Sequence, residues 1–391
     1  MTPPVKEAPK ASKGIDTQDT VSIIVPTYNR SGYIRECLDS LLKQSLPACE
    51  IIVVDDGSTD NTAAIVQSYG DRITYLHKEN EGKPVAVNLA LSQAKGTLIW
   101  IFDDDDVALP NAIETRVNLL ESHPEAAFVY TPHHLGFDGD DGKISRDKLH
   151  PTPVYDDESF FYELLKDCFF HLATCLVRAE AYREVGPFDA QLLGSEDYDM
   201  QIRLARKFQG VYSPEPTFIF RQHAGTRGAK KIRYSAVDRA RVFGRYNKII
   251  GQKILTQLQL GDYLCPPSTS QLSKQDELQA LLNRISVMAS KGCMDQMLDD
   301  LASFFQKADG IFTPLQESQL LSTMTMRHAF AAIRSDWPEF KKRLRQVKQT
   351  PGAEKATHAL AKGLFRYAKS YPGSFSDRLT RLRMAIAVAL T

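Results

Sequence analysis

Four consecutive carboxylates, Asp103–Asp106, stand at the end of Ile99–Phe102, an apolar run of strand length. Acidic runs usually belong to solvated loops, but this one follows a segment that is hydrophobic enough to be buried. Four like charges within ~13 Å of extended chain repel one another and stay ionised together only beside a cation. A hard divalent ion, Mg²⁺ or Mn²⁺, with phosphate oxygens completing its shell, would remove that repulsion. We therefore expect a metal–phosphate site here, with a plain acidic turn as the alternative.

Apolar runs and segments of helical periodicity alternate four times in the first 122 residues. The expected strands are Val21–Val25, Glu50–Val54, Ile73–His77 and Leu98–Phe102. Such strand–loop–helix repeats predict a mostly parallel, Rossmann-like sheet with helices on its faces. The strands are followed by the polar clusters Pro26–Arg30, Asp55–Ser58, Gly82–Lys83 and Asp103–Asp106. Ligands bind at the carboxyl ends of the strands of such sheets, so we expect the four clusters to meet in one cleft.

The remainder of the chain predicts a division into two domains. Strand signals vanish from about residue 235, and segments of helical periodicity separated by Pro and Gly continue to the end. We expect an α/β domain over residues 20–234 and an all-α domain over residues 235–391. Residues 1–19, rich in Pro and Lys, are expected to be a disordered leader. The polar stretch Pro132–Asp157 is too long for a simple connection and is expected to be a functional loop.

The net charge of zero conceals opposite imbalances in the two halves. Residues 1–230 carry 23 basic and 35 acidic side chains, a net charge of −12, and residues 231–391 carry 25 and 13, a net charge of +12. Residues 341–391 alone hold 12 basic and 2 acidic side chains and end in the apolar run Met384–Leu390. This pattern suggests attachment to anionic lipid headgroups. The alternative is a solvated basic face that packs on the acidic half or on a partner subunit, so a homo-oligomer is also considered.

Cysteine usage and hydropathy bear on location. The six cysteines include no CxxC pair and no metal-type spacing, and no secretory h-region is evident. They are expected to be reduced thiols of a cytoplasmic protein. No run of about 18 apolar residues exists, so no span across a membrane is expected. The predicted location is cytoplasmic, with peripheral attachment at the inner face of a membrane considered.

Five segments together resemble the family 2 glycosyltransferases, which have the GT-A fold. They are VSIIVPTYNR (21–30), IIVVDDGSTDNT (51–62), NEGKPVAVNLA (80–90), IFDDDDVALP (101–110) and GPFDAQLLGSEDYDMQIRLA (186–205). The resemblance covers Val21–His223 and nothing beyond residue 235. It implies an inverting hexosyltransferase-type enzyme that takes a nucleotide-sugar donor. It also implies Mn²⁺ or Mg²⁺, which would stabilise the diphosphate leaving group as a Lewis acid.

The resemblance assigns metal and diphosphate contacts to Asp103–Asp106, which we call the acid motif. It makes Asp103 and Asp105 the metal-binding pair, with Asp105 the more direct ligand. Asp104 would lie beside the ribose or share the metal, and Asp106 could be only a helix cap. His223, after the last expected strand, would reach the metal or the diphosphate; the alternative is a histidine in a surface loop.

Nucleotide contacts are implied for the clusters that follow the earlier strands. Asp56 corresponds to the carboxylate that accepts a hydrogen bond from the base, usually uracil, so a UDP-sugar is the expected donor. Pro26 and Thr27 would wall the same pocket, and Lys83 matches a basic position on the donor side. The alternatives are a capping Asp in a plain turn for Asp56 and a solvated loop lysine for Lys83.

Asp197 is the implied general base, and Glu196 would orient the acceptor. One carboxylate must deprotonate the acceptor hydroxyl in an inverting transfer, although a carboxylate at the start of a helix can also serve only as a cap. The chain lacks the QxxRW motif of processive members, which favours the transfer of a single sugar. The expected acceptor is a hydroxyl of a surface glycan or of a lipid-linked glycan, as in surface polysaccharide biosynthesis, and no nucleic acid partner is expected.

Two other functions compete with this interpretation. A sugar-nucleotide pyrophosphorylase would need a Gly-rich phosphate loop after the first strand, and Pro26–Arg30 contains no glycine. In a non-catalytic scaffold, the helical half would carry the function. The intact acid motif and the pair Glu196–Asp197 argue against the scaffold.

Overall fold

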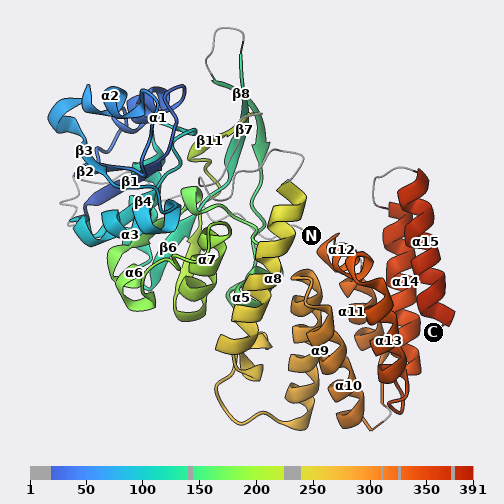
Figure 1. Ribbon diagram of the computed structural model, residues 1–391. Helices are drawn as coiled ribbons and strands as arrows, with labels where there is room; N and C mark the ends of the chain where they lie inside the picture. Colours follow the sequence, from blue (N-terminus) through green and yellow to red (C-terminus); the bar gives the residue numbers. More distant parts are fainter. Residues whose placement is uncertain are drawn as a thin grey trace.

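The computed structural model describes residues 19–139, 144–223, 239–309, 311–324, 327–370 and 375–390 (Figure 1). An α/β part and a region built of helices lie side by side, joined by the long helix α8. Residues 1–18 of the expected leader lie outside the described residues. The expected domain boundary at residue 234 also lies outside them.

A seven-stranded sheet forms the centre of the α/β part. Its strands are β1 (Val21–Thr27), β2 (Glu50–Asp55), β3 (Thr74–His77), β4 (Leu98–Ile101), β6 (Ala126–Tyr130), β9 (Leu176–Arg178) and β10 (Gln209–Tyr212). Their order is β10-β6-β9-β4-β1-β2-β3. The pairs β1–β2, β1–β4, β2–β3 and β6–β10 are parallel, and β9 is antiparallel to both neighbours. The prediction of a mostly parallel sheet is therefore confirmed.

Helices cover both faces of this sheet. They are α1 (Ile34–Leu41), α2 (Thr62–Gln67), α3 (Lys83–Gln93), α4 (Ala112–Ser122), α5 (Asp157–Lys166), α6 (Ala179–Val185) and α7 (Glu196–Lys207), with short 3-10 turns at Gly70–Arg72 and Leu172–Thr174. Successive side chains of β1 alternate between the two faces. Ile23 and Val25 belong to the core under α1 and α4, whereas Ile24 belongs to the core under α3. Burial on both faces explains why β1 reads as a continuous apolar run.

Strand β4 carries the buried Trp100 just before the acid motif. The Trp100 indole N–H donates to the carbonyl of Ala173 (2.8 Å), and the Arg116 guanidinium lies 3.9 Å from the centre of the ring. Burial lowers the pKa of Arg116 to about 9. Contact with the indole face favours the cation in this buried position. These contacts fix the strand from which the acid motif leaves the sheet.

A second, four-stranded sheet corrects one prediction. Its strands are β5 (Val107–Ala108), β7 (His133–Asp138), β8 (Ile144–His150) and β11 (Phe218–Gln222), in the order β5-β11-β7-β8. The stretch Pro132–Asp157, expected to be a functional loop, therefore contains two paired strands. Strand β8 is an exposed edge whose side chains are mostly polar. Its sequence lacks the apolar alternation that would have revealed a strand, because charged residues are favoured on such edges.

All elements described beyond residue 238 are helical. They are α8 (Arg239–Gln257), a 3-10 turn at Leu260–Tyr263, α9 (Lys274–Ser290), α10 (Met294–Lys307), α11 (Pro314–Thr323), α12 (Arg327–Ser335), α13 (Trp337–Lys348), α14 (Glu354–Ser370) and α15 (Phe375–Leu390). We call residues 239–390 the helical region. The expected helical C-terminal part is thus confirmed. Within the described residues, every helix is too short or too polar to cross a membrane.

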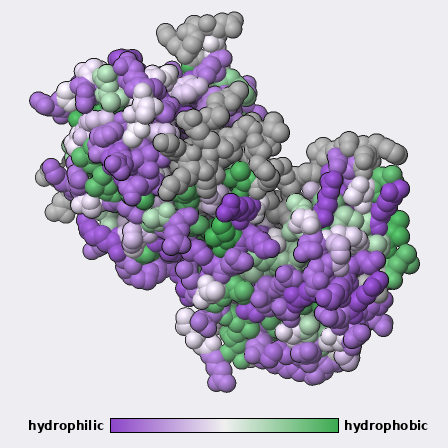
Figure 2. All heavy atoms as spheres, in the orientation of Figure 1, coloured by the Kyte–Doolittle hydropathy of each residue, from purple (hydrophilic) through white to green (hydrophobic). Residues whose placement is uncertain are grey.

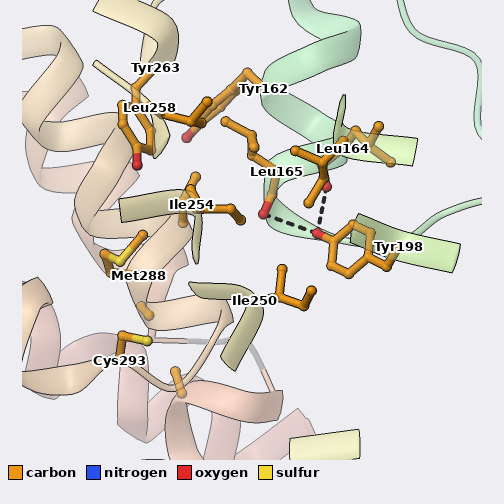
Figure 3. Packing of buried hydrophobic residues seen from close by; sticks show 14 of the residues in the cluster. Tyr162, Leu164, Leu165, Tyr198, Ile250, Ile254, Leu258, Tyr263, Met288 and Cys293 are labelled. Carbon is orange, nitrogen blue, oxygen red and sulfur yellow. Dashed lines mark hydrogen bonds between the residues drawn. The ribbon is translucent and has the colours of Figure 1, made fainter. Parts of the chain in front are cut away.

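One continuous apolar core joins the α/β part to the helical region (Figure 3). Leu164 and Leu165 of α5 and Tyr198 of α7 belong to the same buried cluster as Ile250 of α8 and Met288 of α9. The Tyr198 hydroxyl donates to the carbonyls of Leu164 (2.6 Å) and Leu165 (3.1 Å). Because apolar burial stabilises by about 25 cal/mol per Å², the two regions stabilise each other. Helix α7, whose first turn carries Glu196 and Asp197, is therefore held from both sides.

Candidate active site

A cavity of about 430 Å³ lies at the carboxyl ends of β1 and β4. Nine of the ten site residues expected from the sequence line it: Pro26, Thr27, Asp56, Lys83, Asp103, Asp104, Asp105, Glu196 and Asp197. The tenth, His223, does not line the cavity but contacts Asp105. Its Nε2 lies 2.9 Å from Asp105 Oδ2, and its side chain is buried. Clusters from different parts of the chain thus come together as the parallel sheet predicts. We call this space the catalytic cavity.

Each carboxylate of the acid motif that lines the catalytic cavity has a cationic neighbour. Lys83 Nζ lies 2.5 Å from Asp103 Oδ1. Arg30 Nε donates to Asp104 Oδ1 (3.3 Å), and Arg30 Nη2 lies 3.8 Å from Asp105 Oδ2. Arginine and lysine side chains of the protein therefore relieve much of the repulsion among the carboxylates. The sequence alone predicts a metal ion in this role. Arg30 belongs to the first motif of the chain, but its ion pairs with the acid motif were not anticipated.

Asp106 differs from the other three acids because it does not line the catalytic cavity. It is 1% exposed, and its Oδ1 accepts a hydrogen bond from the backbone N–H of Arg221 (2.9 Å). The Arg221 side chain donates to the carbonyl of Asp105 (2.7 Å) and pairs with Glu36 and Asp138. The alternative in which Asp106 caps a helix is wrong, because α4 starts later, after Asn111. Asp106 instead fixes β11 beside the acid motif.

The donor set can be compared with the needs of a divalent ion. Within the described ranges, no three His, Cys, Asp or Glu side chains are grouped so that they could hold a metal ion by themselves. Mg²⁺ commonly takes one or two protein carboxylates and completes its shell with water and substrate phosphates. Asp105 with His223, and Asp103 nearby, match that smaller requirement. The residues therefore fit a metal that binds together with a diphosphate.

The Asp56 carboxylate is buried among several hydrogen-bond donors. Its oxygens accept from Lys78 Nζ (2.8 Å) and from the backbone N–H groups of Glu81 (3.0 Å) and Gly82 (2.8 Å). Gly82 adopts φ 109°, a conformation that residues other than glycine rarely adopt. These contacts hold the turn that precedes α3. Because a carboxylate has about four acceptor positions, one remains for a further donor in the catalytic cavity.

Lys83 links the acid motif to the start of α7. Its Nζ lies 3.8 Å from Glu196 Oε1, in addition to its contact with Asp103. Burial alone would lower the pKa of Lys83, but the negative charges of Asp103 and Glu196 raise it above its usual range. Lys83 therefore stays protonated and holds the acid motif close to the start of α7. Lys83 is the first residue of α3, and its side chain is 35% exposed.

The two acids at the start of α7 lie in different environments. Glu196 is buried, and burial together with the neighbouring Asp197 raises its pKa to about 7, against the opposing effect of Lys83. Asp197 is partly exposed to the catalytic cavity, and its Oδ1 accepts from the backbone N–H of Tyr198 (2.8 Å). The helix starts at Glu196 after Ser195, so Asp197 is its second residue. Unpaired backbone N–H groups at a helix start stabilise a carboxylate there.

The helical region supplies a wall of the catalytic cavity that no sequence motif indicated. Phe243, Tyr246 and Asn247 of α8 line the cavity together with the residues of the α/β part. A Cβ at Gly194 would lie only 2.8 Å from the Tyr246 ring, so glycine allows this close approach. The sequence beyond residue 235 gave only helical periodicity, and periodicity does not tell which other part of the chain a helix will contact.

Lys291, between α9 and α10, also reaches the catalytic cavity and is 2% exposed. Its Nζ donates to the carbonyl of Lys166 (3.0 Å) and to the Tyr198 hydroxyl. Burial lowers the pKa of Lys291 to about 8, although the nearby Asp167 and Cys168 act in the opposite direction. A buried lysine of this kind ties the helical region to the first turn of α7.

Comparison with known proteins agrees with this geometry. Residues 22–186 match the model of the glycosyl transferase family 2. An uncharacterized glycosyltransferase of Rickettsia typhi is 31% identical over 296 residues, which cover 73% of this chain and 80% of that protein. GlyG, a glycosyltransferase of Streptococcus pneumoniae, is 38% identical over 130 residues, 32% of this chain and 42% of GlyG. The chain therefore belongs to the family 2 glycosyltransferases.

Solved structures support the fold. Residues 1–349 of S. aureus TarS, in complex with UDP-GlcNAc, align with a TM-score of 0.52 at 19% identity. The alignment covers 84% of this chain and 92% of that structure. The chain spans only part of several curated relatives: 64% of an uncharacterized glycosyltransferase of Rickettsia prowazekii and 35% of one from Rickettsia felis.

Proposed function

We propose that the protein is a metal-dependent, inverting glycosyltransferase. It moves a sugar from a nucleotide-sugar, with a UDP-sugar the favoured donor, to a hydroxyl of a glycan or of a lipid-linked acceptor. The observation that carries this proposal is the meeting of Asp56, the acid motif and Asp197 in one cavity. Family membership argues against a pyrophosphorylase, and the clustered acids argue against a scaffold.

The donor lies on the side of the catalytic cavity formed by β1, β2 and the acid motif. Pro26 and Thr27 wall the nucleotide, and the remaining acceptor position of Asp56 suits a base N–H such as that of uracil. That TarS was solved with UDP-GlcNAc supports a uridine nucleotide in this fold. Asp104 faces the same side, beside the ribose or sharing the metal.

Asp105, with Asp103 and His223, would hold the metal. When bound, the metal supplies positive charge to the diphosphate leaving group. Arg30 and Lys83 already pair with these acids and would shift their contacts toward the phosphates as the donor enters. The cations of the protein thus offset part of the negative charge of the acid motif before the donor enters.

Asp197 takes the proton from the acceptor hydroxyl, and Glu196 orients the acceptor. Asp103, Asp104 and Asp105 are committed to the metal and the diphosphate, so they are not available as the base. A single base on the acceptor side leads to direct in-line attack and inversion at the anomeric carbon. A base on the acceptor side contributes a factor of roughly 10²–10⁴ to turnover.

The proposed location is the cytoplasmic face of a membrane, with contact through residues 341–391. The exposed apolar side chains of α15, Leu379, Ile386 and Leu390, recur at spacings that place them on one face of the helix. Figure 2 shows apolar surface along the outer edge of this helix. Some basic residues of this segment already have partners: Arg343 pairs with Asp295 and Asp299. Lipid-linked acceptors would lie close to a membrane-bound enzyme.

Calorimetry with UDP and Mn²⁺ tests the metal and donor assignment. We expect wild-type protein to bind UDP more tightly with Mn²⁺, and Asp105→Ala to lose that gain because it removes the most direct ligand. Asp106→Asn is the matched control: it lies next in the chain, lines no part of the cavity and keeps an acceptor oxygen for Arg221. Unchanged Mn²⁺-dependent UDP affinity in Asp105→Ala would contradict the assignment.

A further inference from the structure

A second cavity, of about 660 Å³, lies where α5, α9 and α11 meet the segment 264–268. Its lining includes no residue of the acid motif and none of α7. Its volume falls in the range of about 300–1,000 Å³ that is usual for ligand sites. We call it the distal cavity. It lies at the junction between the α/β part and the helical region, a common place for ligand binding.

Neutral amide side chains form one wall of the distal cavity. Asn283 Oδ1 accepts from Gln279 Nε2 (2.9 Å) and from Gln319 Nε2 (2.7 Å), and Asn283 Nδ2 donates to the carbonyl of Tyr263 (2.7 Å). The three amides therefore hold one another in fixed orientations. Each amide has more donor and acceptor positions than these bonds use. Polar groups held in place this way bind a ligand with little loss of conformational entropy.

The remaining lining favours a neutral ligand. Among the described residues around the distal cavity, Lys166 and Asp276 are the charged ones. Lys166 pairs with Glu163 (2.7 Å), and Asp276 accepts from the Ser273 hydroxyl (2.7 Å) that caps α9. No surplus of positive charge is offered to a phosphate. The amides of the wall and the serine hydroxyls of the lining instead suit sugars, which have many hydroxyls.

The distal cavity and the catalytic cavity share one lining residue. Lys166, the last residue of α5, lines both. Lys291 lines the catalytic cavity and donates to the Lys166 carbonyl, so a residue of the helical region holds the Lys166 backbone in place. The two cavities therefore adjoin at Lys166, and a linear ligand that spans both would run along this residue.

We propose that the distal cavity binds the inner sugars of a neutral oligosaccharide acceptor whose terminal hydroxyl reaches Asp197. The proposal rests on the proposed function for the identity of the reaction. It narrows the acceptor class to glycans of several sugars and gives the helical region a part in acceptor choice.

A tryptophan at the rim of the distal cavity tests this proposal. Ser322 is an exposed residue of α11 that lines the cavity, and Ser318, also exposed, lies one turn earlier and does not line it. The full chain and its Ser322→Trp and Ser318→Trp variants are applied to a microarray of neutral and phosphorylated glycans of one to eight sugars. We expect the wild type and Ser318→Trp to bind neutral oligosaccharides in preference to monosaccharides, and Ser322→Trp to bind them about tenfold more weakly or worse.

Equal binding by Ser322→Trp and the wild type would overturn the proposal, as would binding of phosphorylated glycans alone or of no oligosaccharide. UDP affinity with Mn²⁺ is measured for the same variants and should be unchanged in both, because neither serine lines the catalytic cavity. Loss of oligosaccharide binding with normal UDP binding supports the distal cavity. Oligosaccharide binding by a wild type that binds no UDP would refute the proposed function and leave the glycan site in place.

Discussion

The α/β part and the helical region contribute to the same site in different ways. The α/β part places its side chains through short motifs at strand ends, and these motifs are visible in the sequence. The helical region contributes Phe243, Tyr246 and Lys291 through packing alone. The contribution of the α/β part to the catalytic cavity therefore depends on local sequence, whereas that of the helical region depends on how the two regions fit together. Variants in the two regions should accordingly change different measured quantities.

Asp197→Asn should give the largest effect, confined to turnover. The amide keeps the size of the side chain and an oxygen for the Tyr198 N–H, but it cannot take a proton. We expect turnover, measured as UDP release from a UDP-sugar, to fall about 10²–10⁴-fold with unchanged UDP affinity and melting temperature. Asp157→Asn, in the first turn of α5 and outside the catalytic cavity, is the control. Near wild-type turnover in Asp197→Asn, or a retained anomeric configuration in the product, would contradict the role of this acid.

Lys291→Met should change the dependence of stability on pH. Burial lowers the pKa of Lys291 to about 8 from 10.5, so between these values the unfolded chain binds a proton that the folded chain does not. The free energy of unfolding of the wild type should therefore rise by about 3 kcal/mol over this window relative to Lys291→Met.

Urea unfolding at pH 8 and pH 10.5 measures this difference. Lys307→Met, at the exposed end of α10, serves as the control and should follow the wild type. Parallel pH profiles for the wild type and Lys291→Met would show that the lysine is not buried between the regions as described.

Vesicle binding should give the smallest effect and concerns the helical region alone. Each Lys or Arg near an anionic surface contributes about 1 kcal/mol. We expect the protein to sediment with phosphatidylserine-containing vesicles at low salt, to be released at high salt, and to ignore neutral vesicles. Ile386→Asp, on the apolar face of α15, should weaken this binding. No sedimentation with anionic vesicles at low salt would leave the packed basic face as the better interpretation.

The sequence predicted most of the cavity lining in the α/β part because this lining is built from local signals. Strand periodicity, followed by Pro26–Thr27, Asp56 and the acid motif, placed these groups at one sheet edge. Their exact partners were not predictable. The pairing of Arg30 with Asp104 and of Asp106 with the Arg221 backbone joins residues more than 70 positions apart. Contacts over such separations arise only when the sheet has formed.

The remaining differences come from elements whose sequence conceals their environment. Strand β8 is polar because it is an exposed edge, so its pattern matched a loop. Lysine is usually a surface residue, and Lys291 is buried because it packs against Lys166 of α5 and Tyr198 of α7. Burial of a charged group depends on tertiary contacts that one segment does not encode.

The buried indole of β4 and a second tryptophan in the helical region give each region its own fluorescent reporter. The chain has two tryptophans: Trp100, three residues before Asp103, and Trp337, at the start of α13. Replacing Trp337 with Phe would leave emission from Trp100 alone. Since Trp100 lies in the strand that carries the acid motif and contacts the Arg116 cation, its emission would report on donor binding without any added dye. Replacing Trp100 with Phe instead would leave a signal that follows only the helical region.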